Sequence, residues 1–211
     1  MDTNHTETSA QRALQADKAL IAEVLHRWGL WRDLCDWRAL KAVYAPGATM
    51  QTTWFEGSAE DFVDATERMA AGPARAQHYI GTPSVQINGD RALAHTRITI
   101  LVRGPLEGVE VDATCYGWFI DRLVRLNGQW LIASRVPVYE KDTLLPVDPA
   151  VTLALDPARL ARHPAPYKFM AYMQSLAGAT VNVDLPLPGS AAHSQFLADS
   201  QAWLMADERS R

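Results

Sequence analysis

The sequence predicts an α+β fold in which helices cover one face of a curved antiparallel sheet. Two observations carry this prediction. Apolar residues recur at helical spacing in the first part of the chain, and four runs rich in Ile, Val, Thr and aromatic residues follow Pro73. The connections between these runs are short and contain turn signals, which join antiparallel neighbours rather than parallel strands linked by a crossover helix. Helices followed by such a meander are typical of the α+β class.

Three helices and one short strand are predicted before Pro73. The first helix runs from Ala13 to about Leu34, because its apolar residues fall at helical spacing: Leu14, Ile21, Val24, Leu25, Trp28 and Trp31. Asp36 is the predicted N-cap of a short second helix, which Pro46-Gly47 stops. Residues 48–55 are rich in β-forming types. Ser58, followed by Asp61 at the spacing of a capping box, begins the third helix.

The meander consists of four predicted strand runs, which cover residues 76–87, 91–103, 110–126 and 129–140. Alternation assigns their faces. One face of the second run carries Ala94, Thr96, Ile98 and Ile100, and one face of the third carries Cys115, Gly117 and Phe119. In the fourth run we expect Arg135 on the face of Leu131, Ala133 and Tyr139, opposite Trp130, Ile132 and Ser134.

These patterns divide the chain into three parts. Residues 1–10 are polar and are expected to form a disordered tail, and residues 11–142 form the predicted domain. Residues 143–211 are punctuated by proline and contain two helical stretches, Tyr167–Ala177 and Ser194–Met205. A segment of this size is too small for a confident core of its own. We therefore expect it to wrap around the domain as a C-terminal extension.

Composition and charge exclude several classes of protein. The chain has 20 Lys+Arg and 24 Asp+Glu, a net charge of −4, and shows no basic stripe for a phosphate backbone. No apolar run approaches the roughly 18 residues of a membrane-spanning helix. The polar N-terminus also lacks the basic start and apolar centre of a signal peptide. We expect a cytoplasmic protein that binds neither nucleic acid nor membranes.

Sequence motifs for metals and nucleotide cofactors are absent. Cys35 and Cys115 stand alone, without a CxxC pair or a Cys/His cluster. The sequence also contains no GxGxxG, no glycine-rich loop ending in GK[ST] and no GxSxG. We therefore expect no metal and no cofactor, and any chemistry has to use side chains alone.

Three ionisable residues nevertheless lie among apolar neighbours. Arg135 on an apolar strand face needs an anion, unless it lies at an edge and pairs with a surface carboxylate. His78 is most simply a hydrogen-bonded core histidine, although its near-neutral pKa also suits proton transfer. Asp33 can pair with a neighbouring arginine or cap the next helix. If it meets His78 instead, the carboxylate would orient the imidazole as a general base.

Three segments together resemble one known family: RWGLWRDLCDWRALKAVYAPGATM, AQHYIGTPSVQINGDRALAHT and DRLVRLNGQWLIASR. They are similar to the SnoaL-like branch of the NTF2-like superfamily, which includes scytalone dehydratase, hexachlorocyclohexane dehydrochlorinase and the bile-acid 7α-dehydratase. The resemblance covers roughly residues 12–142. It implies a cone, in which a strongly curved antiparallel sheet and three N-terminal helices enclose an apolar pocket.

The resemblance also implies roles for individual residues. The catalytic aspartate of the family falls on Asp33, its partner histidine on His78 in H-Y-x-G-T, and the arginine that binds or polarises the leaving group on Arg135 in G-x-W-x₄-R. The residues expected to line the pocket and bind substrate are Trp28, Met50, Trp54, Ile98, Cys115, Phe119 and Tyr139. Trp28 stands where relatives have a lysine or a tyrosine, so a donor to the leaving group is missing there.

The expected function is that of a cofactor-independent lyase on a small hydrophobic, aromatic or alicyclic substrate, with His78 as general base. Elimination of water or halide fits this arrangement, and so does retro-aldol C–C cleavage such as the deformylation of a lignin-derived diarylpropane. The alternatives are a cofactor-free double-bond isomerase and a non-catalytic binding or oligomerisation module. Expected partners are the small substrate and further copies of the chain, as a homodimer or homotrimer. The extension is expected to close the pocket mouth of its own chain or of a neighbour.

Overall fold

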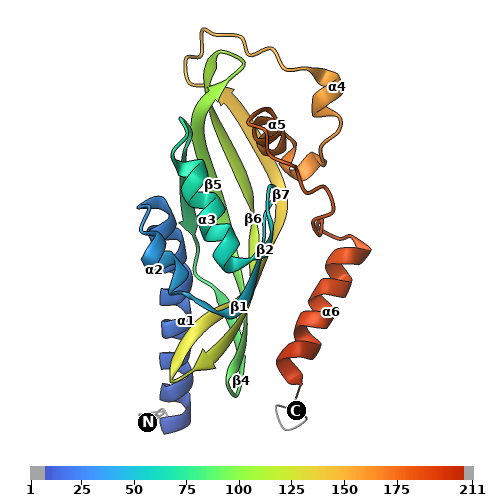
Figure 1. Cartoon of the computed structure of the whole chain (residues 1–211). Helices are drawn as coiled ribbons and strands as arrows, with labels where there is room; N and C mark the ends of the chain where they lie inside the picture. Colours follow the sequence, from blue (N-terminus) through green and yellow to red (C-terminus); the bar gives the residue numbers. More distant parts are fainter. Residues whose placement is uncertain (1–7, 207–211) are drawn as a thin grey trace, which may run out of the picture.

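The fold is built on one seven-stranded sheet. The protein is described by a computed structural model over residues 8–206; most of the predicted tail, residues 1–7, lies outside this range, and Ser9 already begins a helix. The strand order is β2-β1-β7-β6-β5-β3, and β4 also pairs with β5 (Figure 1). All pairs are antiparallel except that of β1 with β7. The strands are β1 (Tyr44–Gln51), β2 (Glu56–Ser58), β3 (Arg75–Ile80), β4 (Ser84–Asn88), β5 (Arg91–Leu106), β6 (Val109–Leu126) and β7 (Gln129–Pro146).

Within residues 8–206, three helices precede most of the sheet, as predicted, and three α-helices and one 3-10 turn follow it. The N-terminal helices are α1 (Ser9–Asp33), α2 (Trp37–Lys41) and α3 (Ala59–Ala70). The later ones are α4 (Pro157–Leu160), the 3-10 turn η1 (Ala165–Tyr167), α5 (Lys168–Leu176) and α6 (Ala191–Met205). Both predicted N-caps are confirmed, because Asp36 accepts from the backbone N–H of Ala39 at 2.9 Å and Ser58 accepts from that of Asp61 at 3.0 Å.

One predicted strand is divided in the structure, and another is shifted. The run 76–87 forms β3 and β4, which both pair with β5 and are separated by Gly81-Thr82-Pro83. Proline lacks the N–H that a continuous ladder needs, which is consistent with a break there. The predicted strand 48–55 is shifted, because β1 begins at Tyr44 and ends at Gln51, and β2 begins only at Glu56. Pro46-Gly47 therefore lie within β1, and the second helix already ends at Lys41. The predicted turn at Asn127-Gly128 is confirmed, with φ of 51° and 78°, the positive values that a tight hairpin turn of this kind requires.

A β-bulge in β7 corrects the predicted faces of that strand. Arg122 pairs with Ser134 but Leu123 pairs with Ile132, so Ala133 is an extra residue in the ladder. The bulge reverses the alternation of side chains. Ile132 and Trp130 therefore lie on the same face as Arg135, and the prediction that they lie opposite it was wrong.

The main core lies on this face of the sheet, which we call the inner face. It carries the predicted sets of β5 and β6, since Ile98 pairs with Gly117 and Ile100 pairs with Cys115. Helices α1 and α3 cover it, together with Tyr167, Met170 and Leu185 of the extension. These elements bury one continuous apolar cluster, which places the ends of α1 and β3 next to it.

The extension lies on both faces of the sheet. Strand β7 first runs on to Pro146, past the predicted domain end at residue 142. Helix α5 then packs on the inner side, while α6 packs on the outer face through Leu204 against Leu93, Ile120 and Val138 (Figure 1). Asn88 Nδ2 donates to the carbonyl of Leu204 at 2.9 Å and fixes the end of α6. The segment after residue 146 thus packs on the sheet rather than forming a separate unit.

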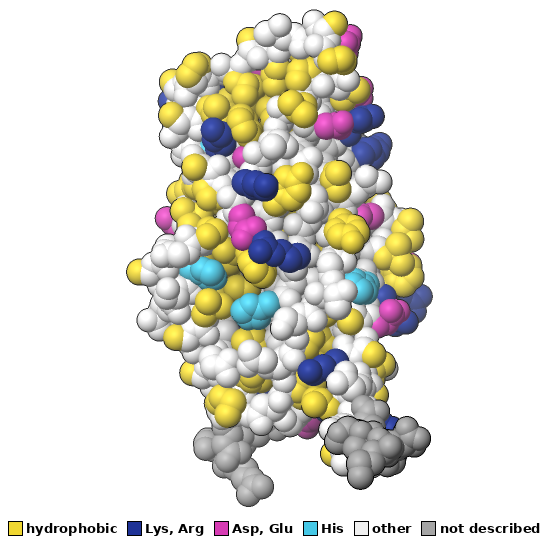
Figure 2. All heavy atoms as spheres, turned by 180° about the vertical axis from the view of Figure 1, so that it is seen from behind, with side chains coloured by type: hydrophobic (Ala, Val, Ile, Leu, Met, Phe, Trp, Pro, Cys, Tyr) yellow, Lys and Arg dark blue, Asp and Glu magenta, His cyan; other side chains and the backbone are white. Residues whose placement is uncertain are grey.

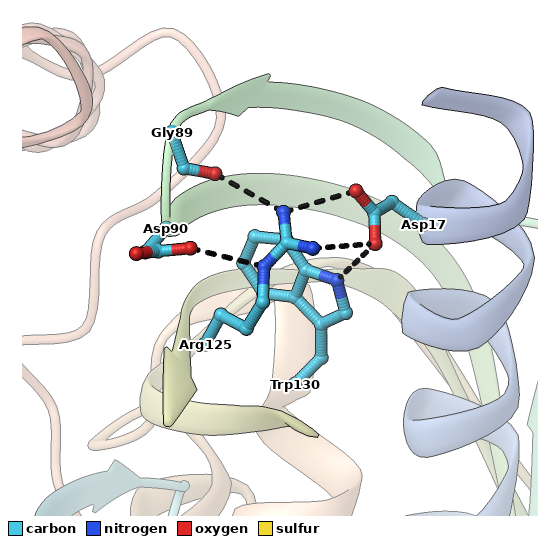
Figure 3. A network of polar contacts seen from close by, with 5 residues as sticks. All are labelled: Asp17, Gly89, Asp90, Arg125 and Trp130. Carbon is cyan, nitrogen blue, oxygen red and sulfur yellow. Dashed lines mark hydrogen bonds and ion pairs between the residues drawn. The ribbon is translucent and has the colours of Figure 1, made fainter. Parts of the chain in front are cut away.

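A cluster of polar contacts joins α1 to the far end of the sheet (Figure 3). Arg125 of β6 makes two hydrogen bonds to Asp17 of α1, at 3.0 and 2.9 Å, and an ion pair with Asp90 at 3.1 Å. Trp130 of β7 donates its indole N–H to Asp17 at 3.0 Å, and the guanidinium of Arg125 lies 4.6 Å from the centroid of the same ring. The cluster fixes the first half of α1 on β6, β7 and the β4–β5 turn.

The surface seen from behind the view of Figure 1 mixes basic and acidic side chains with hydrophobic ones (Figure 2). Within residues 8–206, no helix combines the length and the apolar character needed to cross a membrane.

Candidate active site

The site begins where α1 approaches β3. The buried stripe of α1 consists of Ile21, Leu25, Trp28 and Gly29. A Cβ at Gly29 would lie 2.8 Å from Cγ1 of Ile80 and 3.5 Å from the carbonyl oxygen of His78. The missing side chain therefore lets the helix lie close against β3. Asp33, one turn later and the last residue of α1, reaches His78 because of this approach.

Asp33 and His78 form the predicted pair. One carboxylate oxygen of Asp33 accepts from the backbone N–H of His78 at 2.7 Å, and the other lies 2.6 Å from the ring Nδ1. A carboxylate only accepts, so Nδ1 carries the hydrogen and Nε2 has the lone pair. The His78 side chain is 4% exposed and that of Asp33 is 23% exposed. Both position and tautomer of the imidazole are thus set by a single carboxylate.

The imidazole is neutral at physiological pH. Burial, the charge of Arg32 and, to a smaller extent, that of Arg135 lower the pKa of His78 to about 4, against the opposing effect of Asp33. Among residues 8–206, none forms a hydrogen bond with Nε2, and this atom is not fully buried. The ring is therefore an unprotonated base with an available lone pair.

Trp28 joins the pair to the neighbouring aromatic residues. Its ring meets that of His78 edge to face, with centroids 5.4 Å apart. Its indole N–H donates to the hydroxyl of Tyr44 at 2.5 Å, and that hydroxyl donates to the sulfur of Met50 at 3.8 Å. Trp28 is thus held in place as part of the wall around His78, rather than as a free donor toward a leaving group.

Arg135 is fully buried and paired with a residue that the sequence analysis did not single out. Its Nε and Nη2 donate to the two carboxylate oxygens of Asp121 on β6, at 2.6 and 3.1 Å. The guanidinium lies 4.2 Å from the ring centroids of both Trp28 and Phe119, and its Nη1 has no hydrogen-bond partner among the described residues. Strand alternation places Asp121 on the same face as Phe119 and Cys115, and this was the sequence signal that could have identified it as a partner of Arg135.

The other residues predicted to bind substrate lie on or beside the inner face. Ile98, Cys115, Phe119 and Tyr139 are buried in the main core, and so is Met50, whereas Trp54 is half-buried in the turn between β1 and β2. Burial raises the pKa of the Cys115 thiol, which makes it a poor nucleophile. These residues lie in or against the apolar cluster that contains Trp28, and the ring of Trp28 contacts that of His78.

The extension covers this surrounding from the side of β7. The rings of Tyr139 and Tyr167 have centroids 5.5 Å apart. Asp142 accepts from the backbone N–H groups of Phe169 and Met170 at 2.7 and 2.9 Å, which fixes the start of α5. Burial raises the pKa of Asp142 to about 6. Helix α5 is thereby attached to the strand that carries Arg135 and Tyr139.

A surface hollow lies apart from the Asp33–His78 pair. A hollow of about 330 Å³ is bounded by Lys41, Tyr44–Ala48 and Ser58–Glu60, and none of the predicted substrate-binding residues lines it. Within the described part of the chain, no group of three or more His, Cys, Asp or Glu side chains is arranged to hold a metal ion.

Comparison with known proteins assigns the family. A model of the SnoaL-like domain matches residues 14–136. Pea pathogenicity protein 2 of Fusarium vanettenii is 31% identical over 184 residues, which cover 86% of this chain and 78% of that protein. The curated name of this relative describes a role in pathogenicity and no reaction.

Solved structures agree on the fold. Hexachlorocyclohexane dehydrochlorinase type 2 superposes with a TM-score of 0.55 at 13% identity, over 68% of this chain and 97% of that one. A candidate scytalone dehydratase from Novosphingobium aromaticivorans superposes with a TM-score of 0.52 at 14% identity, over 68% and 99% of the two chains. At these identities the likeness shows the fold alone. The chain therefore belongs to the SnoaL-like domain family and has the NTF2-like fold that its sequence predicts.

Proposed function

We propose that the protein is a cofactor-independent lyase that acts on a small hydrophobic substrate with an aromatic or alicyclic body. The observation that carries this proposal is the neutral imidazole of His78, held through Nδ1 by Asp33, with its Nε2 lone pair unused. Such a ring can take a proton from a carbon or a hydroxyl group of the substrate. The dehydrochlorinase and dehydratase names of two structural neighbours support the same class of reaction.

The step is a base-initiated elimination or cleavage. Nε2 takes the proton, and the electron pair of the broken C–H or O–H bond moves into the substrate. A β-leaving group then departs, or a C–C bond breaks in the retro-aldol sense. Asp33 stabilises the imidazolium that forms, because its charge lies 2.6 Å from Nδ1. A double-bond isomerase would use the same first step and return the proton to another carbon.

The test uses 5-nitrobenzisoxazole, an aromatic probe whose C–H deprotonation breaks its N–O bond and releases a coloured phenolate. We expect the protein to accelerate this reaction over free imidazole at equal concentration. His78→Ala should lower the rate at least about a hundredfold, the lower end for a general base. Asp33→Asn should lower it about tenfold or more, because the neutral amide no longer stabilises the imidazolium.

The pH profile gives an independent reading. Since the pKa of His78 is lowered to about 4, the base form persists as pH falls, and the rate should stay level from about pH 8 to pH 5 and drop only below that. His95→Ala is the matched control, because His95 lies on β5 with its neighbour in the ladder, Ile120, on the outer face. A wild-type rate no higher than that of His78→Ala would contradict the proposal and favour a non-catalytic binding module.

A further inference from the structure

Arg32 is a charged residue of the site to which the lyase chemistry gives no role. It follows Trp28 by one helical turn, so it continues the stripe that α1 turns toward the inner face. Its side chain is half-buried, yet its guanidinium makes no hydrogen bond or ion pair with a described residue. The adjacent Asp33 acts on Arg32 through its charge, but its two carboxylate oxygens hydrogen-bond to His78 and neither makes a hydrogen bond or ion pair with Arg32.

The electrostatic contacts of Arg32 show which side chains its charge reaches. Its positive charge helps to lower the pKa of His78 and opposes the rise that burial causes in the pKa values of Tyr44 and Tyr139, and all three residues lie on or beside the inner face. Burial in turn lowers the pKa of Arg32 itself. Arg32 follows Trp28, whose ring contacts that of His78, by one helical turn, and its charge acts on three side chains on or beside the inner face.

Tyr139 supplies a second unused donor near this cation. Its ring is 4% exposed, and its hydroxyl has no hydrogen bond to a described residue and is not fully buried. Burial raises the pKa of Tyr139, so the hydroxyl keeps its proton. Arg32, Tyr139 and Nε2 of His78 are thus three polar groups of one site that lack partners within it.

These donors fit an anion better than a neutral group. A partly desolvated cation without a partner is unfavourable, and a bound anion offsets that cost. The planar fork of a guanidinium matches the two oxygens of a carboxylate, and a phenolic O–H can add a third hydrogen bond. The ring of Trp28, one helical turn before Arg32 and packed against that of Phe119, supplies apolar surface on the same side of α1.

We propose that Arg32, assisted by Tyr139, binds a carboxylate group of the ligand, so that the substrate is an aromatic or alicyclic carboxylic acid. The substrate assignment rests on the proposed lyase function, whereas the carboxylate site itself does not. The bound carboxylate would hold the apolar body of the ligand against Trp28 and next to the Nε2 atom of His78.

The experiment compares two probes that differ in charge, 1-naphthoate and 1-naphthylmethanol, by calorimetric titration of the full chain at pH 7.5. We expect 1-naphthoate to bind at least about tenfold more tightly, as one charge-assisted pair suffices for such a factor. Arg32→Gln should abolish the preference and leave affinity for 1-naphthylmethanol within about twofold of wild type. Arg32→Lys should keep part of it, and Tyr139→Phe should lose about threefold.

The matched control is Arg27→Gln, which removes an arginine of the same helix whose side chain is 54% exposed and paired with Glu23. It should leave the preference for 1-naphthoate unchanged. Equal affinities of the wild type for the two probes, no binding of 1-naphthoate at millimolar concentration, or a preference that survives in Arg32→Gln would each overturn the proposal.

The same titrations with His78→Gln separate this proposal from the lyase proposal. If the preference persists there while no variant shows base-catalysed turnover, the carboxylate site stands and the lyase assignment falls. If turnover depends on His78 but the preference is absent from the wild type, the lyase assignment stands and the carboxylate site falls.

Discussion

Two arginines of the β6–β7 hairpin contact the same types of residue, an aspartate and a tryptophan, but differ in how deeply they are buried. Arg125 and Arg135 each make two hydrogen bonds to one aspartate and lie over the ring of a tryptophan, Trp130 in one case and Trp28 in the other. The Arg125–Asp17 pair is 29% and 18% exposed, and Arg125 also contacts Asp90 and the carbonyl of Gly89. Arg135 and Asp121 are both fully buried, and Nη1 of Arg135 has no partner among the described residues.

The difference separates a structural role from a role in the site. The partly exposed pair has further acceptors around it, although Nε of Arg125 makes an ion pair with Asp90 and no hydrogen bond to a described residue, and it joins α1 to β6, β7 and the β4–β5 turn. The buried pair is unfavourable to desolvate and incompletely satisfied, and it lies against Trp28, the ring that packs on His78. Burial of this kind adds little to stability, since apolar residues would fill the same space as well. The buried pair is therefore better explained by the site than by stability.

The largest expected effect comes from breaking the buried pair on one side. Asp121→Asn leaves the guanidinium of Arg135 buried without a compensating charge, which should lower the free energy of unfolding by about 3–5 kcal/mol. Urea-induced unfolding followed by tryptophan fluorescence measures it. The double variant Asp121→Leu with Arg135→Met, which removes both charges, should recover to within about 1 kcal/mol of wild type. A double variant as unstable as the single one would show that the pair is needed for folding.

A smaller effect is expected at the partly exposed pair. Asp17→Asn weakens the contacts to Arg125 and Trp130 but keeps an amide oxygen that can accept, and Arg125 is partly exposed and still paired with Asp90, so the loss should be about 1–2 kcal/mol. The same unfolding measurement applies. If Asp17→Asn destabilises the protein as much as Asp121→Asn, burial does not distinguish the two clusters in the way proposed.

Salt should give the smallest effect and sharpen the comparison further. Raising the salt concentration from about 0.1 M to 1 M shortens the screening length from about 10 Å to 3 Å, and it screens exposed charges more than buried ones. The destabilisation by Asp17→Asn should therefore shrink by a few tenths of a kcal/mol, while that by Asp121→Asn should hold constant. Parallel unfolding curves at the two salt concentrations test this, and equal changes for both variants would count against it.

Much of the fold was predictable because its signals are local. The caps at Asp36 and Ser58, the turn at Asn127-Gly128 and the helical stripe of α1 each depend on residues close together in the chain. The bulge at Ala133 was not predictable, because nothing in the alternating pattern marks an extra residue in the ladder. Gly81 and Pro83 signalled that 76–87 divides into two strands, and the prediction of a single strand ignored this signal.

The site was only partly predictable from the sequence. The pairing of Asp33 with His78 rested on a family resemblance, and the structure shows the two in contact. Gly29, Asp121 and Arg32 were not predicted as parts of the site. A glycine in a helix has several explanations, and an aspartate or arginine in an amphipathic element is usually at the surface. Only the packing of α1 on β3 and the pairing of β6 with β7 show that these residues lie at the site and not at the surface.

The sequence by itself determined the class of fold, the order of helices and strands, the family, and the acid–base chemistry available to the chain. These follow from patterns of neighbouring residues and from motifs whose spacing is set along the chain. The tertiary structure decided which faces meet and that Asp121 neutralises Arg135. It also decided that Arg32 makes no hydrogen bond or ion pair with a described residue, and that α5 and α6 lie on opposite faces of the sheet. The reason is physical: the burial of a charge and the partners it finds depend on residues that are distant in sequence and meet only when the sheet and helices pack.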